Sequence, residues 1–491
     1  MIARGLVVCG TGSDAGKSTV VAGLCRVLAR QGLRVAPFKA QNMALNSAVT
    51  ASGHEIGRAQ AAQAAAAGVP PEVAMNPVLL KPTDHRSSQV VVNGKPWATL
   101  DARSYQDAKE QLWPLVVEAL DSLRSRFDVV LCEGAGSPAE INLLRHDITN
   151  LRVAEAAGFP ALLVGDIDRG GVFASLFGTV ALLPPHLAGL IRGFVINKFR
   201  GDPALLASGI DELARRTGVA TLGVLPWMDG PGIDAEDSLA LRRPWPAAAG
   251  GSAGPQLDVA VIRFPRISNF TDIDALALEP AVRVRLVDSV SALGRPHLVI
   301  LPGSKATVAD LHWLKASGLA GELARLEGGS VLGICGGYQM LGREICDPVE
   351  SPSPAEVTGL GLLPVATSFE AEKVTRQVRG TALGERIVGY EIHHGRTDPV
   401  DPWVVTEHGA EGSAAGGGAV AGTSVHGLFE ADGFRRAFLA GVARRAGLAW
   451  DPGPAVSFAA AREARIDRIA DTLEAHLDLG AVHTLLKASA P

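Results

Sequence analysis

The sequence has few cysteines, no strong excess of charge of either sign and no long apolar run. Its five cysteines are odd in number and lack CxxC spacing, which indicates neither a disulfide framework nor a zinc site and favours a reducing cytoplasm. The 46 basic and 51 acidic residues give a net charge of −5, so no broad positive field is available for nucleic acid. No run approaches the roughly 20 apolar residues of a membrane helix, and the start shows no signal-peptide layout. We therefore expect neither a nucleic acid nor a membrane as a partner.

The chain has 491 residues, too many for one ordinary domain, and two or three are expected. In the first half, short β-branched runs alternate with helical stretches such as Ser18–Arg30. This alternation is typical of a parallel sheet with helices on both faces. The expected strands are Gly5–Cys9, Leu33–Phe38, Asp128–Cys132, Ala161–Val164, Gly193–Ile196 and Thr221–Leu225.

A stretch rich in proline, glycine and alanine, residues 243–256, interrupts this pattern and is expected to be a linker. We therefore predict one domain over residues 1–242 and a second α/β domain over 257–491. The second domain is expected to contain strands at Leu257–Ile262, Val282–Val287, His297–Leu301 and Ser330–Ile334, a surface loop at Gly409–Gly422 and a closing amphipathic helix at Ala459–Leu477.

A glycine-rich segment, GTGSDAGKS, follows the first expected strand and opens the first expected helix. It varies the GxxxxGK[ST] phosphate loop, because Thr11 occupies the place of the first glycine. Free amides and the helix N-terminus would face an anion there. The alternative is a plain glycine turn. The residues expected to bind ATP are Gly10, Thr11, Gly12, Gly16, Lys17 and Ser18.

A magnesium ion beside the phosphates needs more oxygen ligands than the Ser18 hydroxyl. Glu133 ends the expected strand at Asp128–Cys132 and is the first candidate for a second ligand. Asp14, inside the loop, is a weaker one. The alternative role for such an acidic residue is to cap a neighbouring helix.

A polar segment follows the second expected strand and contains Lys39, Gln41 and Asn42. A cation among amides is suited to gripping a carboxylate and to steadying charge during phosphoryl transfer. Residues 166–171, DIDRGG, occupy a similar place after another strand. Either segment could equally be an ordinary polar loop. We take Lys39, Gln41 and Asn42 as candidate substrate contacts.

A single cysteine, Cys335, lies in the segment GICGG between an apolar run and a helical stretch. Small neighbours let the backbone take a sharp strand-to-helix turn that exposes the sulfur. The helix N-terminus favours a nucleophilic thiolate, and the Gly336 amide can donate to an oxyanion. Gly303, in a turn after another strand, is the second candidate donor. The alternative is a buried cysteine that acts as a small hydrophobe.

A nucleophilic cysteine needs a base, and His426 in the segment SVHGLFE is our choice. Its rivals are His393 and His394, which follow one another in the segment GYEIHHG. Adjacent residues of a strand face opposite ways, and such a pair more often serves hydrogen bonding or substrate contact. We count His393 and Gln339 among the candidate substrate contacts.

Several segments together carry a resemblance that covers nearly the whole chain. They are PFKAQNM at 37–43, CEGAGSP at 132–138, DIDRGG at 166–171, INKFRG at 196–201, RISNFTD at 266–272 and YEIH at 390–393. They resemble the glutamine-hydrolysing cobyric acid synthase family. The phosphate loop is similar to that of dethiobiotin synthetase, and the cysteine elbow to class I glutamine amidotransferases. The resemblance implies a P-loop, parallel-sheet domain for ATP and corrinoid, followed by a flavodoxin-like glutamine amidotransferase domain.

The resemblance further implies ATP-dependent amidation of the b, d, e and g carboxylates of adenosylcobyrinic acid a,c-diamide. Because ammonia must travel between the domains without protonation, we also expect a shielded path for it. Class I glutaminases usually carry a glutamate two residues after the histidine, but Leu428 stands there. A Cys-His dyad is expected, unless a turn brings Glu430 back. Two alternatives remain: a cobyrinic acid a,c-diamide synthase and a partition-type nucleotide switch that forms no amide. The sequence leaves open a homo-oligomer.

Overall fold

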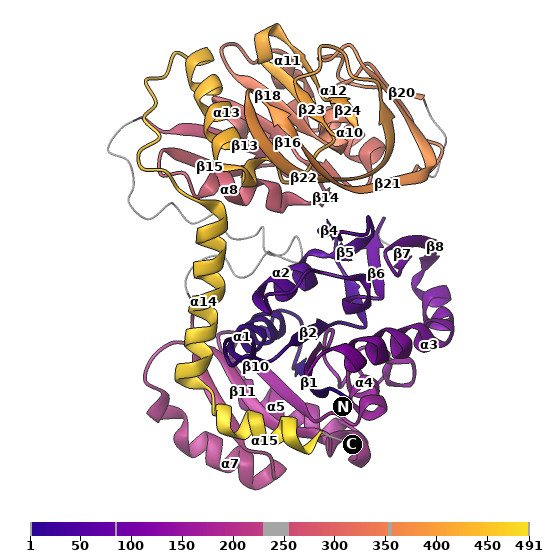
Figure 1. The fold of residues 1–491 in the computed structure, drawn as a ribbon, viewed down its shortest axis with the longest axis vertical. Coiled ribbons are helices and arrows are strands. Elements are labelled where there is room, and N and C mark those ends of the chain that lie inside the picture. Colours follow the sequence, from indigo (N-terminus) through magenta and orange to yellow (C-terminus); the bar gives the residue numbers. More distant parts are fainter. Residues whose placement is uncertain (1, 84–85, 229–254, 352–355, 490–491) are drawn as a thin grey trace. The chain divides into compact units, whose positions relative to one another are not determined.

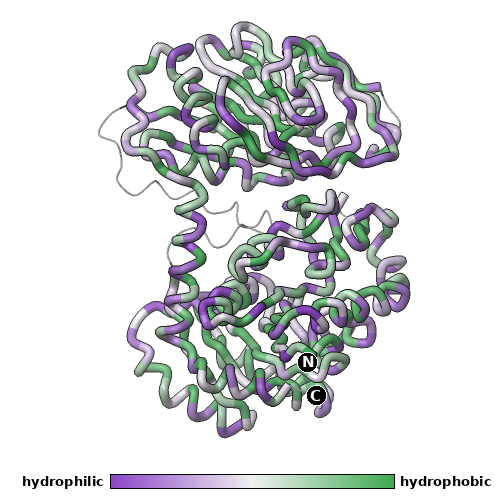
Figure 2. Tube along the Cα trace, viewed as in Figure 1, coloured by the Kyte–Doolittle hydropathy of each residue, from purple (hydrophilic) through white to green (hydrophobic). Residues whose placement is uncertain are grey.

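The computed structural model describes residues 2–83, 86–228, 255–351 and 356–489. Their contacts divide the chain into two compact units. Unit 1 contains the described residues of 1–44, 56–234 and 462–491, and unit 2 those of 45–55 and 235–461. In each unit the apolar strands lie inside, as the hydropathy of the trace shows in Figure 2. No helix in the described part of the chain is both long and apolar enough to span a bilayer.

The centre of unit 1 is a six-stranded sheet in the order β12-β11-β10-β1-β9-β2 (Figure 1). Every neighbouring pair is parallel, so the carboxyl ends of the strands share one edge. The strands are β1 (Arg4–Gly10), β2 (Val35–Phe38), β9 (Val129–Glu133), β10 (Ala161–Asp166), β11 (Ile191–Phe199) and β12 (Thr221–Pro226). All six expected strands of the first half are confirmed, with shifts of a few residues at their ends.

Helices cover this sheet, and a smaller sheet in the order β3-β6-β7-β8 lies beside them. Its strands are β3 (Gln41–Met43), β6 (Val78–Pro82), β7 (Ser87–Val92) and β8 (Lys95–Asp101). The helices are α1 (Lys17–Arg30), α2 (Arg58–Ala66), α3 (Ala102–Arg126), α4 (Leu151–Ala157), α5 (Val172–Leu182), α6 (Pro185–Ala188), α7 (Ala207–Thr217) and α15 (Leu479–Ala488).

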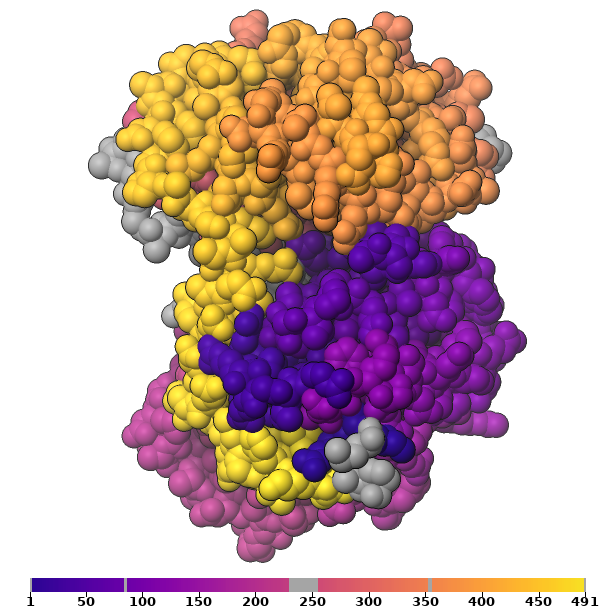
Figure 3. Space-filling model, viewed as in Figure 1, coloured from indigo at the N-terminus to yellow at the C-terminus, as the bar shows by residue number. Residues whose placement is uncertain are grey.

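The helix expected near the C-terminus is confirmed as α14 (Phe458–His476). Within unit 1 its apolar side chains, Ile469 and Leu473 among them, are buried against α1. The approach is close at Gly23, where a Cβ would lie 2.7 Å from Leu473. In Figure 3 the yellow C-terminal residues of unit 1 accordingly lie beside the indigo N-terminal ones.

The main sheet of unit 2 has the order β15-β13-β16-β18-β26-β25. Its parallel part follows the chain order 2-1-3-4-5 of flavodoxin-like folds. The strands are β13 (Leu257–Ile262), β15 (Val282–Val287), β16 (Leu298–Leu301), β18 (Ser330–Ile334), β25 (Ser413–Ala415) and β26 (Val420–Thr423). The helices of this unit are α8 (Asp274–Ala277), α9 (Val290–Leu293), α10 (Thr307–Ala316), α11 (Leu319–Ala324), α12 (Gly336–Leu341) and α13 (Asp432–Arg445).

A second sheet of unit 2 is built around a long antiparallel pair, β21 (Ala366–Ala382) and β22 (Glu385–Thr397). Its remaining strands are β19 (Glu344–Cys346), β20 (Glu356–Thr358), β23 (Val404–Thr406) and β24 (Gly409–Glu411). Two short strands, β14 (Ile267–Ser268) and β17 (Gly303–Ser304), form a separate antiparallel pair. This pair brings the turn after β16 to the residues that follow β13.

The expectation of a surface loop at 409–422 was wrong. The segment forms β24, β25 and most of β26, and β26 pairs with β18 in the main sheet. Gly409 and Gly417 have open space at their Cβ positions, but a Cβ on Gly422 would lie 1.9 Å from the Tyr338 ring. Gly422 thus makes room for a buried aromatic ring.

The compact units also divide the chain differently from the expected domains 1–242 and 257–491. Residues 45–55 pack with unit 2, and the C-terminal residues from Arg462 pack with unit 1. The expected linker, 243–256, lies almost wholly outside the described residues.

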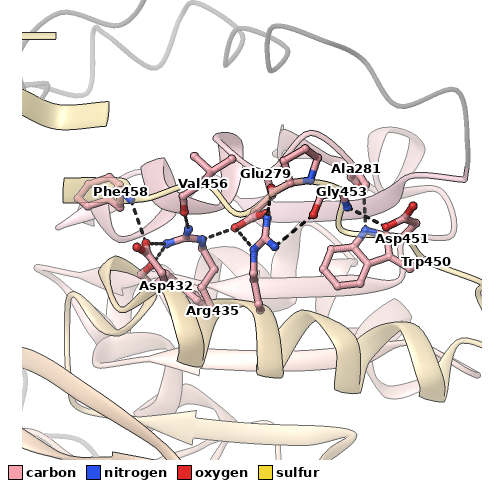
Figure 4. A network of polar contacts seen from close by, with 12 residues as sticks. Glu279, Ala281, Asp432, Arg435, Trp450, Asp451, Gly453, Val456 and Phe458 are labelled. Atoms are coloured by element: carbon pink, nitrogen blue, oxygen red, sulfur yellow. Dashed lines mark hydrogen bonds and ion pairs between the residues drawn. The ribbon is translucent and has the colours of Figure 1, made fainter. Parts of the chain in front are cut away.

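A buried arginine, Arg435 on α13, ties the segment before α14 to the core of unit 2 (Figure 4). Its guanidinium donates to Glu279 at 2.7 Å and to the Val456 carbonyl at 2.7 Å. It also donates to Asp432 and to the Phe429 carbonyl, each at 2.8 Å. Arg436 is the second cation on Glu279, at 3.1 Å.

We predict that Arg435→Ala lowers the free energy of unfolding by about 3–5 kcal/mol, since it removes one partner of a buried charge pair. Among the described residues, the fully buried Glu279 would then keep Arg436 as its one cationic partner. Urea unfolding of the full chain measures the loss. Arg444→Ala, which removes an exposed arginine of the same helix, is the matched control and should change the midpoint little. Equal midpoints for the two variants would contradict the prediction.

Candidate functional site

The phosphate loop of unit 1 joins β1 to α1, as its sequence predicts. Gly16 has a φ of 102°, and a Cβ there would lie 2.0 Å from the Asn197 side-chain amide nitrogen. That amide donates to the Ala15 carbonyl at 2.9 Å. The Lys17 ammonium donates to the Gly12 carbonyl at 2.9 Å and to the Gly136 carbonyl at 3.2 Å. Lys17 is thus folded over the loop, where a phosphate would lie.

Glu133 lies at the centre of the polar groups beside this loop. Its carboxylate accepts from the Ser18 hydroxyl at 2.8 Å and from the Lys39 ammonium at 2.9 Å. Gln63 of α2 is a further donor. Burial raises the pKa of Glu133, but the Lys39 charge and the hydrogen bonds outweigh burial, and the net pKa is below its usual value. A buried carboxylate that stays ionised next to a hydroxyl suits the oxygen ligation that Mg²⁺ requires.

The other residues predicted for this site, Asp14, Gln41 and Asn42, contact protein side chains other than Glu133. Asp14, with a φ of 59°, pairs with Arg169 at 3.2 Å. Gln41 accepts from the Tyr105 hydroxyl at 2.6 Å, and the buried Asn42 amide donates to Gln60 at 2.9 Å. Of the three predicted metal ligands, the structure joins Ser18 and Glu133 through a direct contact and pairs Asp14 with an arginine.

We predict that Gly16→Ala weakens ATP binding by about tenfold or more, because a left-handed backbone costs a residue with a Cβ about 1–3 kcal/mol. The new methyl group must also displace the Asn197 amide. Calorimetric titration of the full chain with ATP measures the affinity. Gly32→Ala is the matched control, because Gly32 has a φ of 82° with nothing near its Cβ position. It shares the backbone strain but should keep ATP affinity, and equal losses in the two variants would contradict the prediction.

In unit 2, Cys335 occupies the turn between β18 and α12, as the glycines around it predict. Its φ of 50° and ψ of −108° are strained for a residue with a side chain. A Cβ on Gly337 would lie 1.9 Å from the Leu301 carbonyl oxygen. The close packing of the helix start on β16 therefore requires glycine. This backbone is that of a nucleophile elbow.

The structure brings His426 to this cysteine. His426 is buried, and its Nδ1 lies 2.7 Å from a carboxylate oxygen of Asp272. The second oxygen of Asp272 accepts from the Gly427 amide at 2.8 Å. Burial lowers the pKa of His426, but the Asp272 charge and hydrogen bond and the Cys335 thiol outweigh it and raise the pKa to about 10. The geometry therefore favours an imidazolium beside the sulfur.

The two candidate oxyanion donors, Gly336 and Gly303, lie at the start of α12 and in the turn after β16. A Cβ on Gly336 would lie 2.9 Å from the backbone nitrogen of Ser304, so the two backbones are in close contact. Gly303 lies against the catalytic candidate itself, since its Cβ position is 3.2 Å from Cε1 of His426. The Ser304 hydroxyl donates to the buried Asp310 at 2.6 Å, which holds the turn. Burial raises the pKa of Asp310 to about 6.

The candidate substrate contacts of unit 2 lie near the same place. Gln339 is buried, and its amide oxygen accepts from the Thr307 hydroxyl at 3.3 Å. A Cβ on Gly395 would lie 2.4 Å from the Gln339 amide nitrogen, and the Gly395 carbonyl accepts from Nδ1 of His393 at 2.7 Å. Burial lowers the pKa of His393 to about 4. His393 is thus a neutral ring whose Nε2 has no hydrogen-bond partner among the described residues.

Two residues of this site, Asp272 and Asn269, were absent from the predicted set. Both lie in the segment 266–272, which the sequence offered only as part of a resemblance. Asn269, with a φ of 51°, directs its amide nitrogen to Nε2 of His426 at 3.3 Å. Asp272 contacts Nδ1 of His426, and this orienting role is the one for which Glu430 was considered. The RISNFTD motif was the available signal, but its separation from His426 by 154 positions concealed the contact.

Comparison with known families identifies two domains in the chain. Residues 6–234 match the family described as the CobQ/CobB/MinD/ParA nucleotide binding domain, and residues 258–434 match the CobB/CobQ-like glutamine amidotransferase domain. A nucleotide-binding domain joined to a glutamine amidotransferase domain defines a glutamine-dependent amide ligase.

Relatives along the whole chain specify the family. Cobyric acid synthase of Frankia casuarinae is 54% identical over 510 residues, which cover 99% of this chain and 97% of the relative. Those of Rhodococcus jostii and Streptomyces coelicolor are each 53% identical, with 99% of this chain covered and 96% and 97% of the relatives. The chain belongs to the cobyric acid synthase family.

Proposed function

We propose that the protein converts adenosylcobyrinic acid a,c-diamide to adenosylcobyric acid by amidating its b, d, e and g carboxylates, with glutamine as the nitrogen donor and ATP as the energy source. The observation that carries the proposal is the contact of Cys335, His426 and Asp272 in a chain that also holds a phosphate loop. The names of the full-length relatives support the choice of substrate.

In the glutaminase reaction, the Cys335 sulfur attacks the side-chain amide carbon of glutamine, and Gly336 and its neighbours donate hydrogen bonds to the oxyanion. His426 gives its proton to the departing nitrogen, which leaves as ammonia, and a thioester remains. Asp272 holds the imidazole through Nδ1, so that Nε2 transfers the proton. Water then attacks the thioester, His426 takes its proton, and glutamate is released.

In the synthetase reaction, a carboxylate oxygen of the corrinoid attacks the γ-phosphorus of ATP and ADP leaves. Lys17 neutralises charge on the phosphates, as its position over the loop allows. Ser18 and Glu133 are the residues that would hold Mg²⁺, which neutralises phosphate charge when bound. Ammonia then attacks the acyl phosphate, phosphate leaves, and the amide forms. We place this chemistry in the cytoplasm, in accord with the scattered cysteines.

Glutamine labelled with ¹⁵N in its amide group tests the proposal. With MgATP and adenosylcobyrinic acid a,c-diamide, the purified protein should incorporate four labelled nitrogens, which mass spectrometry counts. Two nitrogens incorporated into cobyrinic acid, and none into the diamide, would instead identify the a,c-diamide synthase. ATP hydrolysis with no nitrogen transferred to either corrinoid would favour the nucleotide switch.

A further inference from the structure

Residues 45–55 come from the N-terminal part of the chain but belong to unit 2. They form a turn between β4 (Ser47–Val49) and the start of β5 (Glu55–Gly57). The Glu55 carboxylate is fully buried and pairs with Lys373 of β21 at 2.6 Å. It also accepts from the Ser47 hydroxyl at 2.7 Å. This hairpin, residues 45–55, is therefore fixed to unit 2 by a buried charge pair.

The main chain of Ser47 contacts two of the residues that lie against the His426 ring, Asn269 and Tyr390. Its amide donates to the Asn269 side-chain oxygen at 2.9 Å, and its carbonyl accepts from the Tyr390 hydroxyl at 3.1 Å. Asn269 reaches Nε2 of His426 with its amide nitrogen. The Tyr390 ring stacks on the imidazole, with 5.2 Å between the ring centres and 21° between the planes. One peptide segment thus supports two neighbours of the same ring.

A second pair of contacts strengthens this arrangement. The buried Asn46 accepts from the Phe270 amide at 3.2 Å, next to Asn269. Val49 packs with Tyr390 and Ile392 in a small apolar cluster. The hairpin therefore holds the backbone around Asn269 and the side chain of Tyr390 together.

We propose that the hairpin 45–55 is an integral part of the glutaminase site and that Asn269 and Tyr390, held by Ser47, are positioning residues for His426. This inference rests on the proposed glutaminase function of Cys335. Asp272 fixes one ring nitrogen, but a single hydrogen bond leaves the ring plane free to tilt. The Asn269 amide donates to Nε2 when His426 is neutral, and the Tyr390 ring lies against the imidazole face in either protonation state, so together they limit the tilt of the ring.

Two variants test the proposal in the full chain. Tyr390→Phe keeps the stacked ring but removes its bond to Ser47. Lys373→Met releases Glu55 at the far side of the hairpin, without altering any residue that contacts His426. For each variant we expect the glutaminase kcat to fall about fivefold to tenfold with KM within about twofold, as for a loss of alignment rather than of substrate binding. Tyr338→Phe is the matched control, because it removes a buried hydroxyl bonded to Ser413 at 2.7 Å in the same unit.

Alkylation of Cys335 by iodoacetamide provides a readout that stability alone would not move. It is measured against pH in a Cys346→Ser background, since Cys346 is the exposed cysteine among the described residues. A misaligned imidazolium activates the sulfur less, so the alkylation rate should fall across the pH series in Tyr390→Phe and Lys373→Met but not in Tyr338→Phe.

The outcomes separate the inference from the function on which it rests. If Cys335→Ala keeps its glutaminase activity, the proposed function itself fails. If that substitution abolishes the activity while Tyr390→Phe and Lys373→Met match wild type in kcat and in the alkylation profile, the positioning role is overturned alone. If the control Tyr338→Phe lost as much kcat as the two test variants, the positioning role would also be overturned, because the losses would then reflect general destabilisation.

Discussion

Replacing Cys335 with alanine should abolish amidation that uses glutamine and leave amidation that uses ammonium chloride intact. In the proposed mechanism the sulfur forms the thioester, and removal of a covalent nucleophile typically costs at least about 10⁴-fold in rate. The phosphate loop and Glu133 belong to the other compact unit, so activation of the carboxylate by ATP does not need the sulfur. Both rates are measured on one preparation by corrinoid mass, with either glutamine or ammonium chloride as the nitrogen source.

Cys346→Ala is the matched control for this prediction. Cys346 lies on β19 in the same unit and is exposed, so its loss should change neither rate. A Cys335→Ala protein that still hydrolysed glutamine at the wild-type rate would refute the assignment of the nucleophile. Loss of the ammonium-dependent reaction as well would show that the two reactions are not separable in the way proposed.

The parts of the fold that the sequence could predict are those in which function imposes a local pattern. The phosphate loop and the cysteine elbow each need glycines at fixed offsets, because a Cβ at Gly16 or Gly337 would overlap neighbouring atoms. Buried parallel strands also appear as apolar runs, so both main sheets were predictable. Such signals lie within a few residues of the feature that they indicate.

Contacts between distant segments left no such signal. Asp272 and His426 meet through the turn that follows β14 and the residues after β26, and no spacing rule connects them. The sequence assigned no role to the hairpin 45–55, since nothing in its composition indicates which unit it packs against. The strand β26 was predicted as loop because glycine and alanine were taken as signs of exposure. In the structure Gly422 of β26 leaves the space that the buried Tyr338 ring requires.

Replacing Asp272 with asparagine should lower the glutaminase kcat by about 10²-fold or more, a loss within the range for proton transfer by a positioned base. Asparagine has nearly the same shape, but it can present an amide N–H to Nδ1 and so favour the wrong tautomer of His426. Steady-state glutaminase assays measure the effect. Asp258→Asn is the matched control, because Asp258 pairs with Arg285 at 2.8 Å in the same unit and belongs to neither site. Equal rates in Asp272→Asn and wild type would show that the carboxylate is not needed. The site would then work as the Cys-His dyad that was expected because Leu428 stands in place of the usual glutamate.

The same substitution should change how stability depends on pH. The pKa of His426 rises from 6.5 to about 10 in the folded protein, so the folded state retains a proton that the unfolded chain releases above pH 6.5. A raised pKa of this kind contributes stability that is fully present below pH 6.5 and is lost as the pH rises through about 10. Asp272 is the main source of the increase, since burial acts against it. The difference in unfolding free energy between wild type and Asp272→Asn should therefore be largest just below pH 6.5 and should shrink as the pH approaches 10. Urea unfolding at a series of pH values measures it, and a difference that stayed constant across that interval would show that Asp272 acts through packing rather than through its charge.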